Sequence, residues 1–217
     1  MKPCVIFDLD GTLVDSLPGI AASLNRSLSA HALPEHPRAA IRGFVGDGLR
    51  TLVQRAAPAG TDAAGIDSLI GVFKADYALT WADGTKAYPG IHGLLIELMK
   101  SGFQLAVLSN KTHAFTVEMA RGLFPGIHFS EVLGQRDGSP HKPHPAGALQ
   151  ISLTLGAAPE NCVVIGDSTI DIETAANAGM KAIGVSWGYH NRARLLAAGA
   201  ETIIDHPSEL PALLALH

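Results

Sequence analysis

The sequence has few of the features that mark secreted, membrane or nucleic-acid-binding proteins. Only two of its 217 residues are cysteines, so a disulfide framework is not expected. No apolar run reaches the roughly 18 residues of a membrane helix, and the first residues show no signal-peptide pattern. We therefore expect a cytoplasmic protein without a membrane partner. With 16 Lys and Arg against 20 acidic residues, the net charge of −4 also argues against a nucleic-acid partner.

The composition is that of a globular, enzyme-like protein. Hydrophobic residues make up 47% of the chain and charged residues 17%, which is enough apolar material for one large domain or two small ones. Cys4 and Cys162 each lie within an apolar, strand-like run, so we expect both to be buried, reduced thiols. The oligomeric state cannot be read from these patterns.

Two regions with different patterns predict a two-part α/β organisation. Residues 15 to about 81 carry apolar stripes at helical spacing and no strand-like run, which predicts a helical domain over 15–85, inserted after the first strand. After residue 88, helices alternate with apolar strands, which predicts a Rossmann-like parallel sheet with helices on both faces, formed by 1–14 and 86–217. The polar segment 82–90 is expected to be the connection between the two parts.

Chemically capable side chains follow the most apolar strands. They are Asp8 and Asp10 after 4–7, Ser109 and Asn110 after 103–108, Asp167 and Asp171 after 162–165, and Lys142 in the loop after a weaker strand near 127–133. Each alone has an ordinary explanation as a turn residue, a helix cap or a solvated charge. Because the carboxyl ends of parallel strands share one edge of the sheet, we expect these side chains to meet in one crevice. Their convergence favours a functional site.

The expected set of side chains fits metal-assisted phosphoryl chemistry. Carboxylates in contact repel one another by about 4 kcal/mol per pair at an effective dielectric constant near 20, and a divalent cation relieves this repulsion. With oxygen ligands alone, Mg²⁺ is the expected ion. A cation together with a lysine, a hydroxyl and an amide can receive a phosphoryl group, and a carboxylate can attack it. The second acid can then act as general acid and base.

The ordered motifs resemble those of the haloacid dehalogenase-like phosphohydrolases. Residues 8–12 (DLDGT), Ser109-Asn110, Lys142-Pro143 and 166–171 (GDSTID) are similar to the four motifs of that superfamily, and the resemblance covers essentially the whole chain. The helical insertion resembles the superfamily's cap domain. Residues 45–50 (VGDGLR) and 142–145 (KPHP) are similar to the phosphoglycolate phosphatase branch in particular.

The resemblance implies a role for each matching residue. Asp8 would be the nucleophile and a Mg²⁺ ligand, Asp10 the general acid and base and a ligand through its backbone carbonyl, and Asp167 the third protein ligand. Lys142 would be catalytic and would hold the phosphoryl oxygens together with Ser109 and Asn110. Gly11 and Thr12 would lie beside the substrate, with Thr12 supporting Asp10, and Asp171 would stand behind the metal ligands. Ser168 occupies a position where some relatives carry a second acid, so this chain departs there from the family pattern of metal ligands.

The inserted domain also offers candidate contacts to substrate. Gly48 opens a helix that carries Arg50, and both are candidate substrate-binding residues, although a solvated arginine after an ordinary loop explains them equally well. Arg50 could meet a carboxylate, which favours phosphoglycolate among small phosphorylated metabolites. The resemblance thus implies a Mg²⁺-dependent phosphomonoester hydrolase with an aspartyl-phosphate intermediate. A phosphatase for pyrophosphate or sugar phosphates, a sugar-phosphate mutase and a non-enzymatic binding module remain alternatives.

Overall fold

The computed structural model describes residues 4–215 and divides into two compact units. The first, here the core unit, comprises the chain up to Val14 and from Ala87 onward, and the second, here the helical unit, is Asp15–Lys86. The chain passes between them at β2 (Val14–Asp15) and β3 (Lys86–Ala87), two-residue strands that pair with each other. Neither short strand is predicted by the sequence patterns, because two residues carry no periodicity.

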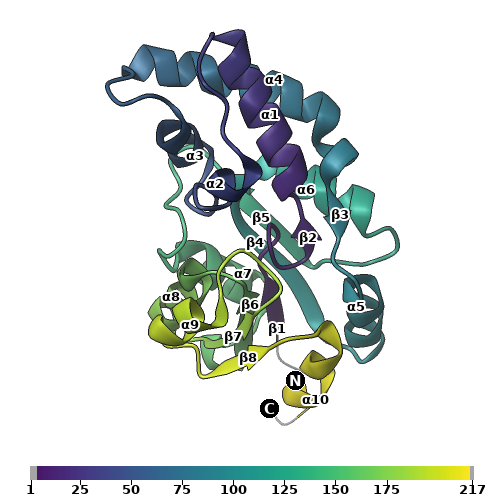
Figure 1. Ribbon diagram of the computed structural model, residues 1–217. Coiled ribbons are helices and arrows are strands. Elements are labelled where there is room, and N and C mark those ends of the chain that lie inside the picture. The colour runs from purple at the N-terminus through teal and green to yellow at the C-terminus, as the bar shows by residue number, and fades with distance from the viewer. Residues whose placement is uncertain (1–3, 216–217) are drawn as a thin grey trace. The chain divides into compact units, whose positions relative to one another are not determined.

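The core unit is a six-stranded sheet with helices on both faces, as the sequence predicts (Figure 1). Its strands are β1 (Cys4–Phe7), β4 (Gln104–Thr112), β5 (Glu131–Gln135), β6 (Cys162–Gly166), β7 (Lys181–Val185) and β8 (Thr202–Ile204), in the order β5-β4-β1-β6-β7-β8. Its helices are α5 (Ile91–Lys100), α6 (His113–Leu123), α7 (Ala146–Thr154), α8 (Thr169–Ala178), α9 (Arg192–Ala197) and α10 (Leu210–Leu214), with 3-10 turns at Pro159–Asn161 and Pro207–Glu209. All neighbouring strands pair in parallel, so their carboxyl ends share one edge.

Burial explains why β1 lies near the centre of this sheet. Its four residues are buried and pair with β4 on one side and β6 on the other. In Figure 1, α5 and α10 lie on one side of the sheet and α7 and α8 on the other. A strand covered on both faces must be apolar throughout, which is the pattern that makes it visible in the sequence. Cys4 and Cys162 are register partners on β1 and β6, and both are buried free thiols, as predicted.

The first and last residues of two strands in the core unit differ from those that the sequence predicts. β4 continues four residues beyond the predicted end at 108, with an irregularity in its pairing between Leu108 and Thr112. β5 begins at Glu131 rather than near 127. The preceding residues form a turn, in which the Ile127 amide donates to the Phe124 carbonyl (3.1 Å). The apolar residues before β5 therefore serve the turn and not the strand.

The helical unit consists of α1 (Leu17–Ala30), α2 (Arg38–Arg42), α3 (Leu49–Ala56) and α4 (Ala63–Gly84). The predicted stripes are largely buried, with Ile20, Leu24 and Leu28 on α1 facing inward together with Phe73 and Tyr77 of α4. α4 continues through 82–84, which the sequence pattern assigns to the connection. Gly84 lies so close to α1 that a Cβ there would be 2.7 Å from the Gly19 amide nitrogen, so a glycine allows the last turn of α4 to pack against α1. None of the described helices is long and apolar enough to cross a membrane.

Candidate active site

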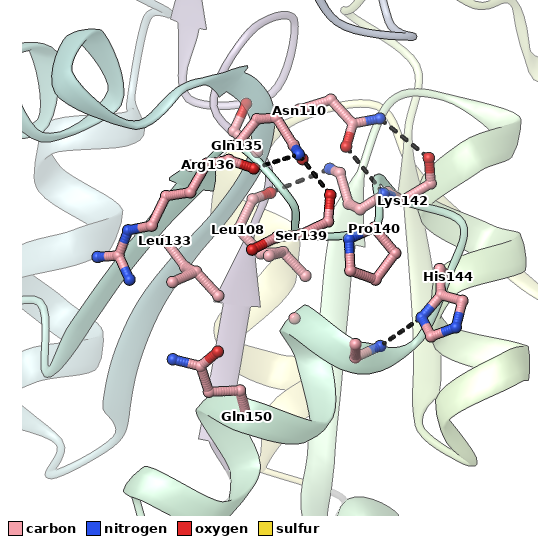
Figure 2. A pocket seen from close by; sticks show the side chains of 14 residues that line it. Leu108, Asn110, Leu133, Gln135, Arg136, Ser139, Pro140, Lys142, His144 and Gln150 are labelled. Carbon is pink, nitrogen blue, oxygen red and sulfur yellow. Dashed lines mark hydrogen bonds between the residues drawn. The ribbon is translucent and has the colours of Figure 1, made fainter.

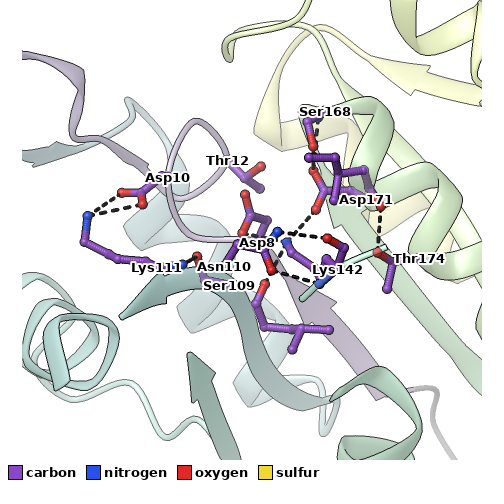
Figure 3. Close-up of polar contacts among 12 residues, drawn as sticks. Asp8, Asp10, Thr12, Ser109, Asn110, Lys111, Lys142, Ser168, Asp171 and Thr174 are labelled. Atoms are coloured by element: carbon purple, nitrogen blue, oxygen red, sulfur yellow. Dashed lines mark hydrogen bonds and ion pairs between the residues drawn. The ribbon is translucent and has the colours of Figure 1, made fainter. Parts of the chain in front are cut away.

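Asp8 extends from the carboxyl end of β1 and is almost completely buried. Its backbone amide donates to the Ile165 carbonyl of β6 (2.9 Å), which fixes its position at the sheet edge. Its carboxylate Oδ1 accepts a hydrogen bond from Lys142 Nζ at 2.8 Å (Figure 3). The other oxygen, Oδ2, receives no hydrogen bond from the residues that the structure describes. Asp8 thus has one oxygen held in place and one available to react or to bind a cation.

Lys142 lies between two acids. Its ammonium group donates to Asp8 Oδ1 (2.8 Å), to Asp171 Oδ1 (2.7 Å) and to the Leu108 carbonyl (3.0 Å), which accounts for its three donors. Burial acts to lower the pKa of Lys142, but Asp171 and Asp8 outweigh it and raise the pKa above its ordinary value. Lys142 is therefore a buried, permanently charged group at neutral pH.

Asn110 at the end of β4 holds the loop that carries Lys142. The Lys142 amide donates to Asn110 Oδ1 (2.8 Å), and Asn110 Nδ2 donates to the Lys142 carbonyl (3.0 Å). Ser109 lies next to it, 5% exposed, and its Oγ accepts from the Lys111 amide (3.3 Å). The carboxyl-terminal part of β4 and the loop that carries Lys142 are in this way tied into a single rim, although the loop residues lie far from β4 in the sequence.

Asp167 at the end of β6 is held from the turn after β1 and from the loop after β7. Thr12 Oγ1 donates to its Oδ1 (2.9 Å), and the Tyr189 amide donates to its Oδ2 (2.6 Å). Two glycines leave room for this carboxylate, because a Cβ at Gly11 or at Gly188 would lie within 2.4 Å of Asp167 atoms. The Gly188-Tyr189 pair is not identified from the sequence. The available signal is that it follows β7, whose carboxyl end lies at the same sheet edge.

Asp171, in the first turn of α8, orients Lys142. Its Oδ2 accepts from the Ser168 amide (3.0 Å) and the Ser168 hydroxyl (2.6 Å), forming a capping box, while its Oδ1 accepts from Lys142. Both oxygens are thus already engaged by protein donors. The two hydrogen bonds from Ser168 fix the Asp171 carboxylate. Asp171 is thereby positioned to support Lys142.

The acidic cluster can accommodate a cation. Oxygens of Asp8, Asp167 and Asp171 lie within 4.8 Å of one another. Burial, opposed by Lys142, raises the pKa of Asp8 from 3.8 to about 7, and burial, Asp171 and Asp8 raise the pKa of Asp167 well above its ordinary value. Proximity and desolvation therefore disfavour the ionised carboxylates, and a divalent cation with oxygen ligands would stabilise them. Asp8 keeps one oxygen without a hydrogen bond from the described residues, and the donors to Asp167 are a neutral hydroxyl and a backbone amide. Asp171 is held more strongly, because one of its oxygens accepts from the Lys142 ammonium and the other from two groups of Ser168.

Asp10, two residues after Asp8, points in another direction. Figure 3 shows its carboxylate turned away from Asp8 toward Lys111, whose Nζ lies 3.1 Å from Oδ1 and 3.2 Å from Oδ2. The side chains of Lys111 and Asp10 are only 8% and 12% exposed. Lys111 is not identified from the sequence, although it directly follows Ser109-Asn110. Lys111 lies beyond the predicted strand end at 108, where a lysine is usually solvated, so its burial against Asp10 could not be anticipated.

The two candidates from the inserted segment belong to the helical unit. Gly48 precedes α3 with a φ of 86°, a backbone conformation that favours glycine, and Arg50 lies in the first turn of that helix as expected. Arg50 forms an ion pair with Asp67 of α4, and the two side chains are 52% and 60% exposed. In this structure Arg50 is therefore engaged by an acid of its own unit.

A cavity of about 160 Å³ lies next to Ser109, Asn110 and Lys142 in the core unit (Figure 2). Leu108, Leu133 and Gly147 contribute apolar surface to it, and Arg136 and His144 contribute polar groups. A Cβ at Gly147 would be 2.7 Å from Leu108 Cδ1. The glycine at the start of α7 thus keeps that helix close to β4, beside the rim.

Comparison with known proteins gives a consistent result. Residues 5–185 match the family described as haloacid dehalogenase-like hydrolase. The phosphoglycolate phosphatase of Pseudomonas putida is 33% identical over 97% of this chain and 78% of its own length. The phosphoglycolate phosphatase of Psychrobacter arcticus is 37% identical over 87% of this chain and 85% of its own. A solved structure from Lactobacillus delbrueckii subsp. bulgaricus, 30% identical, covers 99% of both chains with a TM-score of 0.91.

Proposed function

The chain belongs to the haloacid dehalogenase-like hydrolases and is a phosphatase acting on a small phosphorylated substrate, and from this premise we propose that it hydrolyses phosphomonoesters through an aspartyl-phosphate on Asp8. We propose Mg²⁺ as its metal and phosphoglycolate as its substrate. The single observation that carries the proposal is Asp8 itself, a buried carboxylate with Oδ1 held by Lys142 and Oδ2 free of hydrogen bonds from the described residues.

In the first step, Asp8 Oδ2 attacks phosphorus and the bond to the alcohol oxygen breaks. Asp10 gives its proton to that oxygen as it leaves. Ser109 and Asn110 bind the phosphoryl oxygens, and the charge of the buried Lys142 ammonium beside them stabilises their negative charge. Lys142 also keeps Oδ1 of Asp8 fixed, so that the reacting oxygen is presented in one orientation.

In the second step, a water molecule attacks phosphorus and restores the Asp8 carboxylate. Asp10, now deprotonated, takes a proton from this water. Asp8, Asp167 and the backbone carbonyl of Asp10 are the proposed ligands of Mg²⁺, with Asp171 supporting them. When bound, this ion neutralises the acids and stabilises negative charge on the phosphoryl group. Thr12 and Tyr189 keep Asp167 oriented for that role.

The assignment of phosphoglycolate rests on similarity to curated phosphoglycolate phosphatases of 31–37% identity. The roles of Gly11 and Thr12 beside the substrate, and of the segment 15–85 as a cap that offers Gly48 and Arg50, stay predictions. So does a location in the cytoplasm.

The proposal is tested by measuring phosphate release with and without Mg²⁺ from phosphoglycolate, pyrophosphate, sugar phosphates and nucleotides. We expect Mg²⁺-dependent release with the highest kcat/KM for phosphoglycolate. Asp8→Asn should lower kcat by at least about a thousandfold. Its circular dichroism spectrum should be unchanged, because the amide keeps the shape of the carboxylate. A folded Asp8→Asn variant with normal turnover would rule out the nucleophile assignment.

A further inference from the structure

The geometry points to Lys111 as a specificity-determining residue, which recognises a carboxylate on the alcohol part of the substrate. The enzyme would thereby select phosphorylated hydroxy acids over phosphomonoesters with a neutral alcohol. This inference rests on the proposed function, because it concerns the leaving group of that reaction. Its basis is the position, burial and charge of Lys111.

The proposed role of Asp10 places the alcohol part of the substrate near Lys111. To protonate the leaving oxygen, Asp10 must lie within hydrogen-bond reach of it, so the alcohol part of the substrate lies beside Asp10. Lys111 Nζ is 3.1 and 3.2 Å from the two carboxylate oxygens of Asp10. A group on the carbon next to the leaving oxygen therefore lies close to this ammonium. In phosphoglycolate that group is a carboxylate.

Two other cations of the core unit near the site are engaged elsewhere. Lys142 uses its three donors on Asp8, Asp171 and the Leu108 carbonyl. Arg136 beside the cavity donates to His113 Nε2 (2.8 Å) and is exposed. Lys111 differs from both because it forms an ion pair with Asp10, the residue proposed to touch the leaving group.

The charges around Asp10 favour such a cation for an acidic substrate. A substrate carboxylate beside Asp10 adds a negative charge close to Asp8, in a region where little solvent screens it. With its side chain 8% exposed, Lys111 interacts with nearby charges more strongly than a surface lysine would. The charge of its ammonium therefore attracts a carboxylate that the substrate places beside Asp10. A substrate with a neutral alcohol gains nothing from this cation.

The experiment compares Lys111→Met with the wild type on two substrates, phosphoglycolate and ethyl phosphate, at saturating Mg²⁺. Ethyl phosphate has the same primary leaving oxygen and lacks the carboxylate. We expect kcat/KM for phosphoglycolate to fall at least about tenfold more than that for ethyl phosphate. Lys111→Arg should retain most of the preference. Lys100→Met, which removes an exposed lysine at the end of α5, is the matched control and should change neither value.

Equal losses on both substrates would overturn the inference, because Lys111 would then act only by positioning Asp10. The inference would also be overturned if Arg50→Met lost the preference for phosphoglycolate over ethyl phosphate and Lys111→Met kept it. A measurement of substrate binding without turnover tests this inference separately from the proposed function. In an Asp8→Asn background, calorimetry should show that Lys111→Met weakens binding of phosphoglycolate more than that of ethyl phosphate. This result is expected whether or not the wild type turns over either compound, and its absence contradicts the inference.

Discussion

Lys142 is the residue on which the charge balance of the site depends. Three acids lie close together, and a single buried ammonium bridges two of them at 2.8 and 2.7 Å. Buried ion pairs add little net stability compared with apolar packing, but removing one partner leaves uncompensated charge. The lysine therefore serves the folded state as well as the proposed reaction.

We predict that Lys142→Met lowers the free energy of unfolding of the metal-free protein by about 3–5 kcal/mol at about pH 8, because Asp8 and Asp171 lose their common partner. Urea unfolding followed by circular dichroism measures this change. Lys100→Met, an exposed control, should stay within about 0.5 kcal/mol of the wild type. A Lys142→Met protein as stable as this control would contradict the described charge balance.

Residues differ in how far the sequence reveals them. Asp8 and Asp167 can be located because each follows an uninterrupted apolar strand, and parallel strands bring their ends together. Lys111 cannot be located in this way, because its ion-pair partner, Asp10, is far away in the sequence. The ion pair between Arg50 and Asp67 likewise depends on how α3 and α4 pack, which no local pattern specifies.

At the scale of elements, the turn after β1 matters most for the metal site. Gly11 has a φ of 90° and lies against Asp167, so that a Cβ would be 2.4 Å from Oδ2. The apolar runs of β1 and β6 make those strands predictable. The turn after β1 can be predicted from the Gly11-Thr12 pair in the sequence. The later start of β5 and the longer α4 are not predictable, because tertiary packing decides those ends.

We predict that Gly11→Ala weakens Mg²⁺ binding at least about tenfold, because the added methyl group displaces the Asp167 carboxylate. Calorimetric titration with Mg²⁺ measures the affinity. Gly102→Ala is the matched control, since Gly102 also has a positive φ, 80°, but a Cβ there would meet nothing within 4 Å. Both variants carry backbone strain, and only Gly11→Ala should lose affinity for the metal. Equal Mg²⁺ affinities in the two variants would contradict the placement of Asp167 in the metal site.

At the scale of the whole molecule, the site links folding to pH and to metal. The pKa of Asp8 is raised from 3.8 to about 7, mainly by burial, and the pKa of Asp167 is raised as well. Between pH 3.8 and about pH 7, Asp8 of the folded protein keeps a proton that the unfolded chain has already released. The stability of the metal-free protein therefore falls as pH rises from about 4 to 7. Lys142, whose pKa is raised above its ordinary value, stays charged throughout this range and does not alter the sign.

We predict that the metal-free protein unfolds at a lower temperature at about pH 7.5 than at about pH 5.5, and that Mg²⁺ raises the unfolding temperature more at the higher pH. Ionised carboxylates bind the ion, and the ion removes their repulsion. Differential scanning calorimetry in EDTA and in Mg²⁺ measures both effects. Asp167→Asn should reduce the difference made by Mg²⁺. A Mg²⁺ effect that is larger at low pH would contradict the assigned ligands.

An aspartyl-phosphate on Asp8 can be trapped chemically. The enzyme is mixed with phosphoglycolate and Mg²⁺, quenched during turnover and treated with borohydride, which reduces an acyl phosphate to an alcohol. Peptide mass spectrometry then locates the modified residue. We expect homoserine at position 8, dependent on substrate and absent in Asp8→Asn. Rapid turnover with an unmodified Asp8, or with the label on another residue, would contradict this expectation.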